Sequence, residues 1–186
     1  MNSAIRPTTR RHLLALFALP LAVQAQTMTK PDYTTAKTRI SADYKGDKAA
    51  CASMAGNNKD ICVEQAKGKE KVARAELEYS YTAKDTDRNK VLVAKAESTY
   101  AVAKERCDDF SGDPKDICLK EAKATYEKQK ADITVLEKGN TADARKDAMK
   151  TKTEADYEVA KAKCDQFSGD VKDKCVKDAK TTYKVE

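Results

Sequence analysis

Apolar side chains are sparse along this chain, and where they occur they follow helical spacing. The segment from Lys90 to Phe110 is rich in Ala, Lys and Glu, which are strong helix formers, and it stops at Ser111-Gly112. A second helix is predicted directly afterwards, with Asp113 as its N-cap and Pro114 in its first turn. The positions expected to pack between the two helices are Val91, Leu92, Tyr100, Val102 and Phe110 on the first, and Ile117, Ala122, Tyr126, Ile133 and Leu136 on the second.

This helix-turn-helix pattern occurs three times. Residues 96–126 and 153–183 are identical at 19 of 31 positions, and a more divergent copy lies around residues 40–70. Self-similarity at a fixed period indicates one supersecondary unit used repeatedly. Each copy has a turn glycine, at Gly56, Gly112 and Gly169.

The six cysteines follow the same period as three pairs with one spacing: Cys51/Cys62, Cys107/Cys118 and Cys164/Cys175. Within a pair the cysteines lie at nearly equal distances on either side of the turn glycine. In an antiparallel hairpin they would therefore face each other at disulfide distance. Tyr100 and Tyr126 are also symmetric about their turn, and Tyr157 and Tyr183 repeat the relation, so each tyrosine pair is expected to form a second contact across its hairpin.

The predicted fold is all-α, with three antiparallel helical hairpins, each stapled by one disulfide, in an elongated repeat array. Residues 26–186 form a single domain with hairpins at about 32–84, 87–138 and 141–185. The linkers are predicted at 82–87 and 139–141. Because the helices carry few large apolar residues, they are expected to pack closely through alanine, with the disulfides compensating for the small buried area.

The first 25 residues read as a cleavable secretory signal peptide. Arg6, Arg10 and Arg11 precede an apolar run from Leu13 to Val23, and Val23-Gln24-Ala25 forms a small-x-small cleavage pattern. The arginine pair also allows twin-arginine export, although the general secretory route is favoured. An exported chain with paired cysteines belongs in an oxidising compartment, so the expected location is the periplasm, with no stable membrane anchor.

Composition excludes several kinds of chemistry. Removal of the signal lowers the formal net charge from +6 to +3, which gives no strong case for nucleic-acid binding. The one histidine, His12, lies in the signal, and bridged cysteines leave no thiolate, so nucleophile systems based on His or Cys are absent from the mature chain. The prediction is a protein that is not an enzyme and has no cofactor.

The acidic turns offer one alternative. A hard cation such as Ca²⁺ could bind carboxylates there, and the candidate ligands are Asp108, Asp109, Asp113, Asp165 and Asp170. Helix capping already accounts for several of these residues, and the first copy has Asn57 in place of an aspartate. The favoured interpretation therefore assigns no metal site.

The repeated sequence Cys-Asp-x-Phe-Ser-Gly-Asp-x-Lys-Asp-x-Cys resembles that of a group of uncharacterised exported proteobacterial proteins, rich in Ala and Lys and labelled cell-envelope TolA-like. The resemblance spans nearly the whole mature chain and implies an envelope location. TolA itself has a membrane anchor and a long helical stalk, which stapled hairpins after a cleavable signal do not match. No functional residues are carried over.

The predicted function is that of a non-catalytic periplasmic structural or interaction protein, with a stress-protective role included, whose partner is another envelope protein. Repeat arrays display extended surface and generally bind rather than catalyse. The alternatives are a small-ligand or divalent-cation binding protein that uses the acidic turns, and a periplasmic chaperone.

Overall fold

The computed structural model describes residues 28–185, and this part of the chain is entirely helical outside its turns. Six α-helices follow one another: α1 (Lys30–Ala50), α2 (Gly56–Thr82), α3 (Asp85–Cys107), α4 (Asp113–Glu137), α5 (Ala142–Cys164) and α6 (Gly169–Tyr183). A short 3-10 turn, η1 (Cys51–Ser53), follows α1. The predicted all-α class is confirmed.

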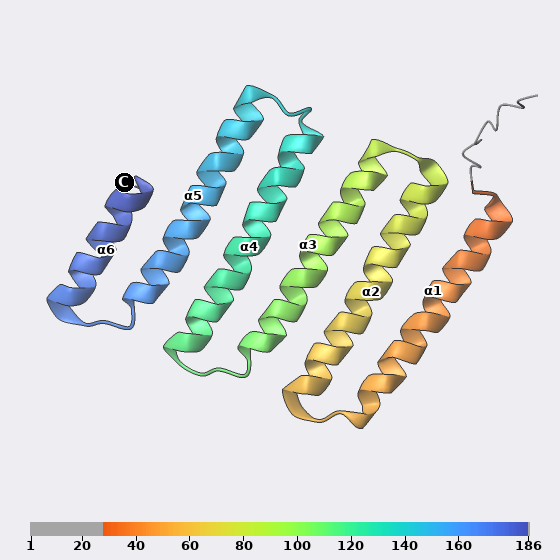
Figure 1. The fold of residues 1–186 in the computed structure, drawn as a ribbon, viewed down its shortest axis with the longest axis horizontal. Helices are drawn as coiled ribbons and strands as arrows, with labels where there is room; N and C mark the ends of the chain where they lie inside the picture. Colours follow the sequence, from red (N-terminus) through yellow and green to blue (C-terminus); the bar gives the residue numbers. More distant parts are fainter. Residues whose placement is uncertain (1–27, 186) are drawn as a thin grey trace, which may run out of the picture.

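The helices lie side by side in chain order, and successive helices run in opposite directions (Figure 1). Within the described residues each helix contacts only the helices before and after it in the sequence. The molecule is therefore a layer one helix thick. Such a layer has two broad faces, two outer helices, and two edges formed by the inter-helix turns.

Local sequence explains most helix ends. Thr29 and Thr141 act as N-caps, since their hydroxyl oxygens accept hydrogen bonds from the backbone N–H groups of Asp32 and Ala144. The chain leaves α2 through Ala83, whose φ of 53° is left-handed, and it passes from α4 to α5 through two such residues, Gly139 and Asn140.

Two details of the predicted second turn are wrong. The helix α3 ends at Cys107, three residues before Phe110, so the turn is longer than expected. The N-cap of α4 is Gly112, and Asp113 is already helical and makes no capping hydrogen bond. Gly112 has φ 61° and ψ −147°, a region that is essentially restricted to glycine. The glycine backbone thus reverses the chain at the place where the sequence suggested a carboxylate cap.

The interior of the layer is built mainly from alanine, because ten of the seventeen buried apolar residues are Ala. Small side chains let neighbouring helices approach closely. The tightest case is Gly68 of α2, where an added Cβ would lie 2.9 Å from the Cβ of Ser98 on α3. Of the predicted packing positions, Val91, Ala122 and Ile133 are buried. By contrast, Phe110 and Leu136 are exposed. Phe110 follows the end of α3, and Leu136 lies in the last turn of α4, where the adjacent helix does not cover it.

All three predicted disulfides are present, and in each the two Cα atoms lie 5.6 Å apart. The bridges are Cys51–Cys62, Cys107–Cys118 and Cys164–Cys175. They link α1 to α2, α3 to α4 and α5 to α6, which we call the stapled pairs.

The two cysteines of a bridge differ in burial, which their symmetric spacing about the turn did not predict. The first cysteine of each bridge is fully buried, whereas the second is only partly buried, at Cys62, Cys118 and Cys175. The non-covalent packing is more extensive elsewhere, between α2 and α3 and between α4 and α5. The covalent links therefore reinforce the helix pairs that pack least against each other.

One predicted tyrosine contact is present. The rings of Tyr100 and Tyr126 stack with centroids 4.9 Å apart between α3 and α4. The equivalent stack of Tyr157 on Tyr183 does not form, since Tyr157 is buried in α5 while Tyr183 sits at the end of the short helix α6.

The predicted signal peptide, residues 1–25, lies outside the described residues. Among residues 28–185, no helix combines the length and the apolar character that crossing a bilayer requires. The three disulfides indicate an oxidising environment, extracellular or periplasmic.

Candidate binding groove

An open groove of about 1280 Å³ is formed by α1, α2 and α3. Because α1 and α3 do not contact each other, α2 alone forms its floor. Interaxial distances of packed helices are about 8–10 Å, so the axes of α1 and α3 stand about 16–20 Å apart. An α-helix with its side chains is about 10–12 Å across, so a helix lying over α2 would have the side chains of α1 and α3 on either side.

The surface inside the groove is mainly apolar. Ile40 comes from α1, Val72 and Ala73 from α2, and Val102 and Ala103 from α3. The lining positions of α2 and α3 include pairs four residues apart, Gly68 with Val72 and Ser98 with Val102, which lie on one face of their helix. The groove thus presents an apolar strip, interrupted by glycine and polar residues, that no described part of the chain covers.

Two glycines make the groove possible. Gly68 brings α2 and α3 together, and the Ser98 hydroxyl there donates a hydrogen bond to the carbonyl oxygen of Ala94, 2.6 Å away. Gly46 of α1 also lines the groove, and an added Cβ there would have no neighbour within 4 Å. The first position permits close helix packing, and the second leaves open space beside α1 at that point of the wall.

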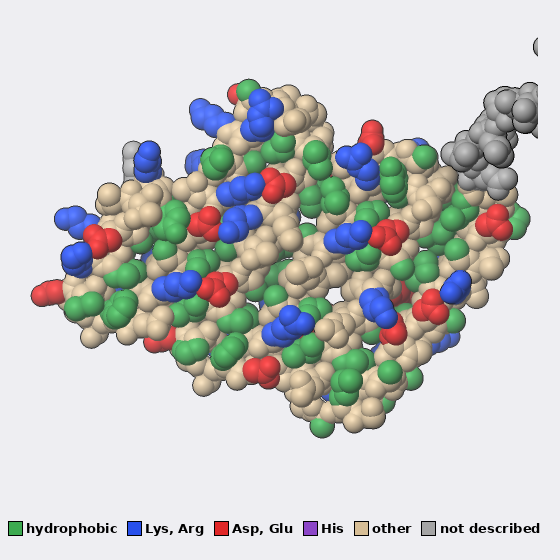
Figure 2. Space-filling model, viewed as in Figure 1, with side chains coloured by type: hydrophobic (Ala, Val, Ile, Leu, Met, Phe, Trp, Pro, Cys, Tyr) green, Lys and Arg blue, Asp and Glu red, His purple; other side chains and the backbone are tan. Residues whose placement is uncertain are grey.

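Charged residues surround the apolar strip, and most of them are already paired. Lys69 donates to Asp47 at 2.9 Å, and Arg74 donates to Glu70 at 2.6 Å. The pairing of Lys with Asp or Glu continues along the layer, where basic and acidic side chains alternate across one face (Figure 2). Arg106, at one end of the groove, forms no ion pair with another described residue.

Charged side chains near the turns also form ion pairs. The ammonium of Lys115 donates to Asp108 at 2.9 Å, and this hydrogen bond raises the pKa of Lys115. In the third stapled pair Lys172 donates to Asp165 at the same distance, and this hydrogen bond holds the pKa of Asp165 below its ordinary value. Each carboxylate is therefore matched by a lysine from the helix that follows it.

The candidate cation ligands are not brought together. Asp108 and Asp165 pair with lysines as described, and Asp109 accepts a hydrogen bond from the side-chain amide of Asn57 at 2.8 Å. Asp113 and Asp170 lie in the first turns of α4 and α6. Within residues 28–185, no three side chains of Asp, Glu, Cys or His converge to form a metal site.

The turn glycines and cysteines lie along one edge of the layer. Gly56, Gly112 and Gly169 have φ values of 57°, 61° and 56°, so the three turns reverse the chain in the same way. None of the described cysteines lines the groove, and the bridge between Cys107 and Cys118 borders a much smaller hollow of about 280 Å³ between α3 and α4. The predicted site residues are thus structural parts of the turns.

The groove lies on a broad face of the layer, and sequence reasoning did not identify it. The sequence feature that could have indicated the groove is a pair of helix-interior glycines, Gly46 and Gly68, found only in the first copy.

Comparison with protein-family models, with curated proteins and with solved structures finds no match to this chain. The function is therefore inferred from the geometry of the chain itself.

Proposed function

We propose that this protein is a non-catalytic interaction scaffold of the bacterial cell envelope, and that it binds an amphipathic helical segment of another envelope protein in the groove between α1, α2 and α3. In this proposal the six helices are three copies of one stapled hairpin, arranged as a repeat array. The first copy has diverged to form the groove, while the second and third extend the array.

The observation that carries the proposal is a groove whose apolar strip is covered by no described part of the chain. Burial of the strip by a partner is favourable, at about 25 cal/mol per Å² of apolar area removed from water. In helix-in-groove binding an amphipathic helix presents apolar anchors at three- and four-residue spacing, and here these anchors would contact the apolar side chains of Val72 and Val102. The surrounding ion pairs favour a partner with a polar outer face.

The compartment follows from the covalent chemistry. Three disulfides persist in an oxidising space, and the N-terminal sequence has the features of an export signal, so the periplasm is the proposed location. The bridges would keep each stapled pair joined under conditions that loosen non-covalent packing. This property supports a stress-protective role as part of the same proposal.

The cation-binding alternative has less support, since two of its five candidate ligands are engaged by lysines and a third by an amide. The chaperone alternative differs in its clients. A chaperone would bind many unfolded chains with little sequence preference, whereas a groove receptor would bind a limited set of folded or folding helices.

The test is site-specific photo-crosslinking in intact cells. A photoreactive amino acid at Val102 points the probe at the groove, and the same amino acid at Lys104, which stands over the Tyr100 ring outside the groove, is the matched control. We expect a discrete crosslinked partner from position 102 that is absent from position 104.

A second variant links that product to the groove. Gly46→Phe places a ring in the open space beside α1 and should abolish the crosslink at position 102 while leaving the three disulfides intact. A crosslink that persists in the filled variant, or one that appears equally at both positions, would contradict the groove as the binding site. A smear of many products from position 102 would favour the chaperone alternative.

A further inference from the structure

A second surface of the protein lies along the edge formed by the three stapled turns. In each turn a large apolar residue occupies the third position after the first cysteine: Met54, Phe110 and Phe167. All three are well exposed, at 45%, 52% and 49% of their maximal area. Exposure of one such residue is ordinary, whereas exposure of three at equivalent positions on one edge is a repeated feature of the unit.

Folding does not account for these side chains. The turn glycines reverse the chain, the cysteines bridge it, and α3 ends at Cys107 before Phe110 is reached. The two phenylalanines nevertheless recur in the second and third copies, in which 12 of the 31 compared positions have diverged. Large apolar groups kept at the tips of turns therefore point to a contact outside the chain.

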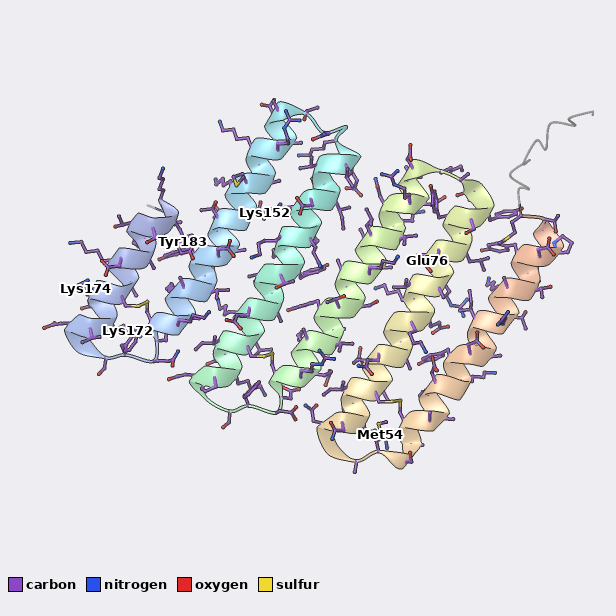
Figure 3. The ribbon with its side chains drawn as sticks, in the orientation of Figure 1. Met54, Glu76, Lys152, Lys172, Lys174 and Tyr183 are labelled. Carbon is purple, nitrogen blue, oxygen red and sulfur yellow. A yellow bond between two sulfur atoms is a disulfide. The ribbon has the colours of Figure 1, made fainter. Side chains whose placement is uncertain are left out.

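The three residues are arranged in a row. The stapled turns lie along the same edge of the layer, with Met54 at the turn between α1 and α2 (Figures 1 and 3). Each step along the row crosses two helix spacings, which corresponds to about 16–20 Å. We call this row the turn comb.

The charge of the edge identifies the chemistry of its partner. Between the two cysteines of each bridge, the three copies have formal charges of 0, −3 and −1, although the whole chain is basic. In the second and third turns Asp113, Asp116, Asp170 and Asp173 form no ion pair with other described residues. Figure 3 shows Lys172 and Lys174 beside the third turn, and the more acidic second turn lies at the centre of the row. An apolar row whose central turn is strongly acidic is complementary to a basic segment that has regularly spaced apolar side chains.

We propose that the turn comb binds an extended, basic polypeptide segment that runs across the three turns, perpendicular to the helices. An extended chain rises about 3.3 Å per residue and places every second side chain on the same side, so anchors about 20 Å apart are six residues apart in its sequence. The partner would thus have a large apolar residue at every sixth position, with Lys or Arg between them. This surface is separate from the groove, and the inference does not depend on the proposed function.

The experiment measures the fluorescence anisotropy of dye-labelled synthetic peptides with the purified, fully oxidised protein. The test peptide has eighteen residues with Leu at positions 4, 10 and 16 in a Lys/Ser background. One control has the same composition with Leu at positions 4, 9 and 14, a five-residue spacing that places successive Leu side chains on opposite sides of an extended chain, and the other replaces every Lys with Glu. We expect the six-residue spacing to bind about tenfold more tightly than the five-residue spacing, and the acidic peptide not to bind.

Protein variants assign the binding to the comb. The double change Phe110→Ser and Phe167→Ser should weaken the test peptide by at least about tenfold, because exposed aromatic anchors contribute most to such contacts. Met149→Ser is the matched control: Met149 is 65% exposed on α5, away from the stapled turns. Retention of all three bridges in each variant, shown by thiol counting, confirms that the turns are intact.

Three outcomes would overturn the proposal. They are equal binding of the two Leu spacings, unchanged binding by the phenylalanine variant, and failure of the basic peptide to bind at low salt. Binding to neutral phosphatidylcholine vesicles in place of the peptide would likewise overturn it, because it would assign the comb to a lipid surface. Loss of affinity between 50 and 300 mM salt would support the role of the aspartates.

Discussion

Two glycines within helices allow a direct test of how this layer is packed, since the same substitution should have opposite effects at the two positions. Gly46 lies in α1 with open space around it, whereas Gly68 lies in α2 against Ser98. Replacing a helix-interior glycine by alanine adds about 0.8–1 kcal/mol of helix propensity at either site. Any difference between the two variants therefore reports the surroundings of the new methyl group.

At Gly46 nothing offsets the gain. We expect Gly46→Ala to stabilise the protein by up to about 1 kcal/mol, which for a chain of this size raises Tm by about 2–4 °C. At Gly68 the new Cβ would lie 2.9 Å from the Cβ of Ser98, which is fixed to its backbone and has no rotamer that avoids the clash. Overpacking costs about 1–3 kcal/mol, so Gly68→Ala should be destabilising by about 1 kcal/mol net.

The assay is thermal unfolding of the oxidised protein followed by far-UV circular dichroism. A double variant, Gly68→Ala with Ser98→Gly, removes the opposing Cβ and should recover most of the loss, giving a coupling energy of about 1–3 kcal/mol in the cycle. Equal stabilisation by both single alanine variants, with no coupling to Ser98, would refute the close approach of α2 and α3. It would also remove the physical basis of the groove, which depends on that approach.

Three further changes test the turns and one helix start. Cys107→Ser should lower the free energy of unfolding by about 3 kcal/mol, because loss of the bond to Cys118 opens a covalent loop of about a dozen residues. Urea denaturation measures this change, and a loss below about 1 kcal/mol would show that the disulfide is dispensable. Gly112→Val should be strongly destabilising in the same assay, because φ 61° with ψ −147° excludes a β-branched side chain, and wild-type stability would contradict the turn geometry. Asp87 is 4% exposed, and hydrogen bonds from Lys90 and Thr82 lower its pKa. Its stabilisation is therefore present above the ordinary aspartate pKa of about 3.9 and is lost as pH falls through the lower folded value, so the Tm difference between wild type and Asp87→Asn should be large at pH 7 and vanish in strong acid.

The sequence was sufficient for the features that depend on local spacing. Cysteines placed evenly about a glycine predicted which sulfurs are bonded, and the alanine-rich segments predicted thin helices with small buried side chains. Features that depend on the neighbouring helix were not predicted. Phe110 has the spacing of a packing residue, but α3 ends before it and no helix lies opposite, so the residue is exposed.

The groove was not predicted for a related reason. Its existence requires knowing that Gly68 faces Ser98, thirty residues later in the sequence and in a different predicted hairpin. Helical periodicity identifies the buried stripe of one helix, but it does not specify which helix covers that stripe or how closely. The prediction of Asp113 as an N-cap was wrong for a more local reason, because the glycine before it adopts a conformation that replaces a side-chain cap.

The two outer helices have few buried contacts with the rest of the layer, since α1 has no buried residue and α6 has only Ala179. They should detach first, while α2 to α5 remain folded, and amide exchange should be fastest in them. The turn that connects each outer helix to its partner keeps it attached, and Cys51–Cys62 and Cys164–Cys175 add a second covalent link that holds the two helices closer together. A tethered helix returns from an effective concentration in the millimolar range, so its redocking is rapid and does not depend on the amount of protein present. The outer disulfides thus limit how far an end helix can move when it opens.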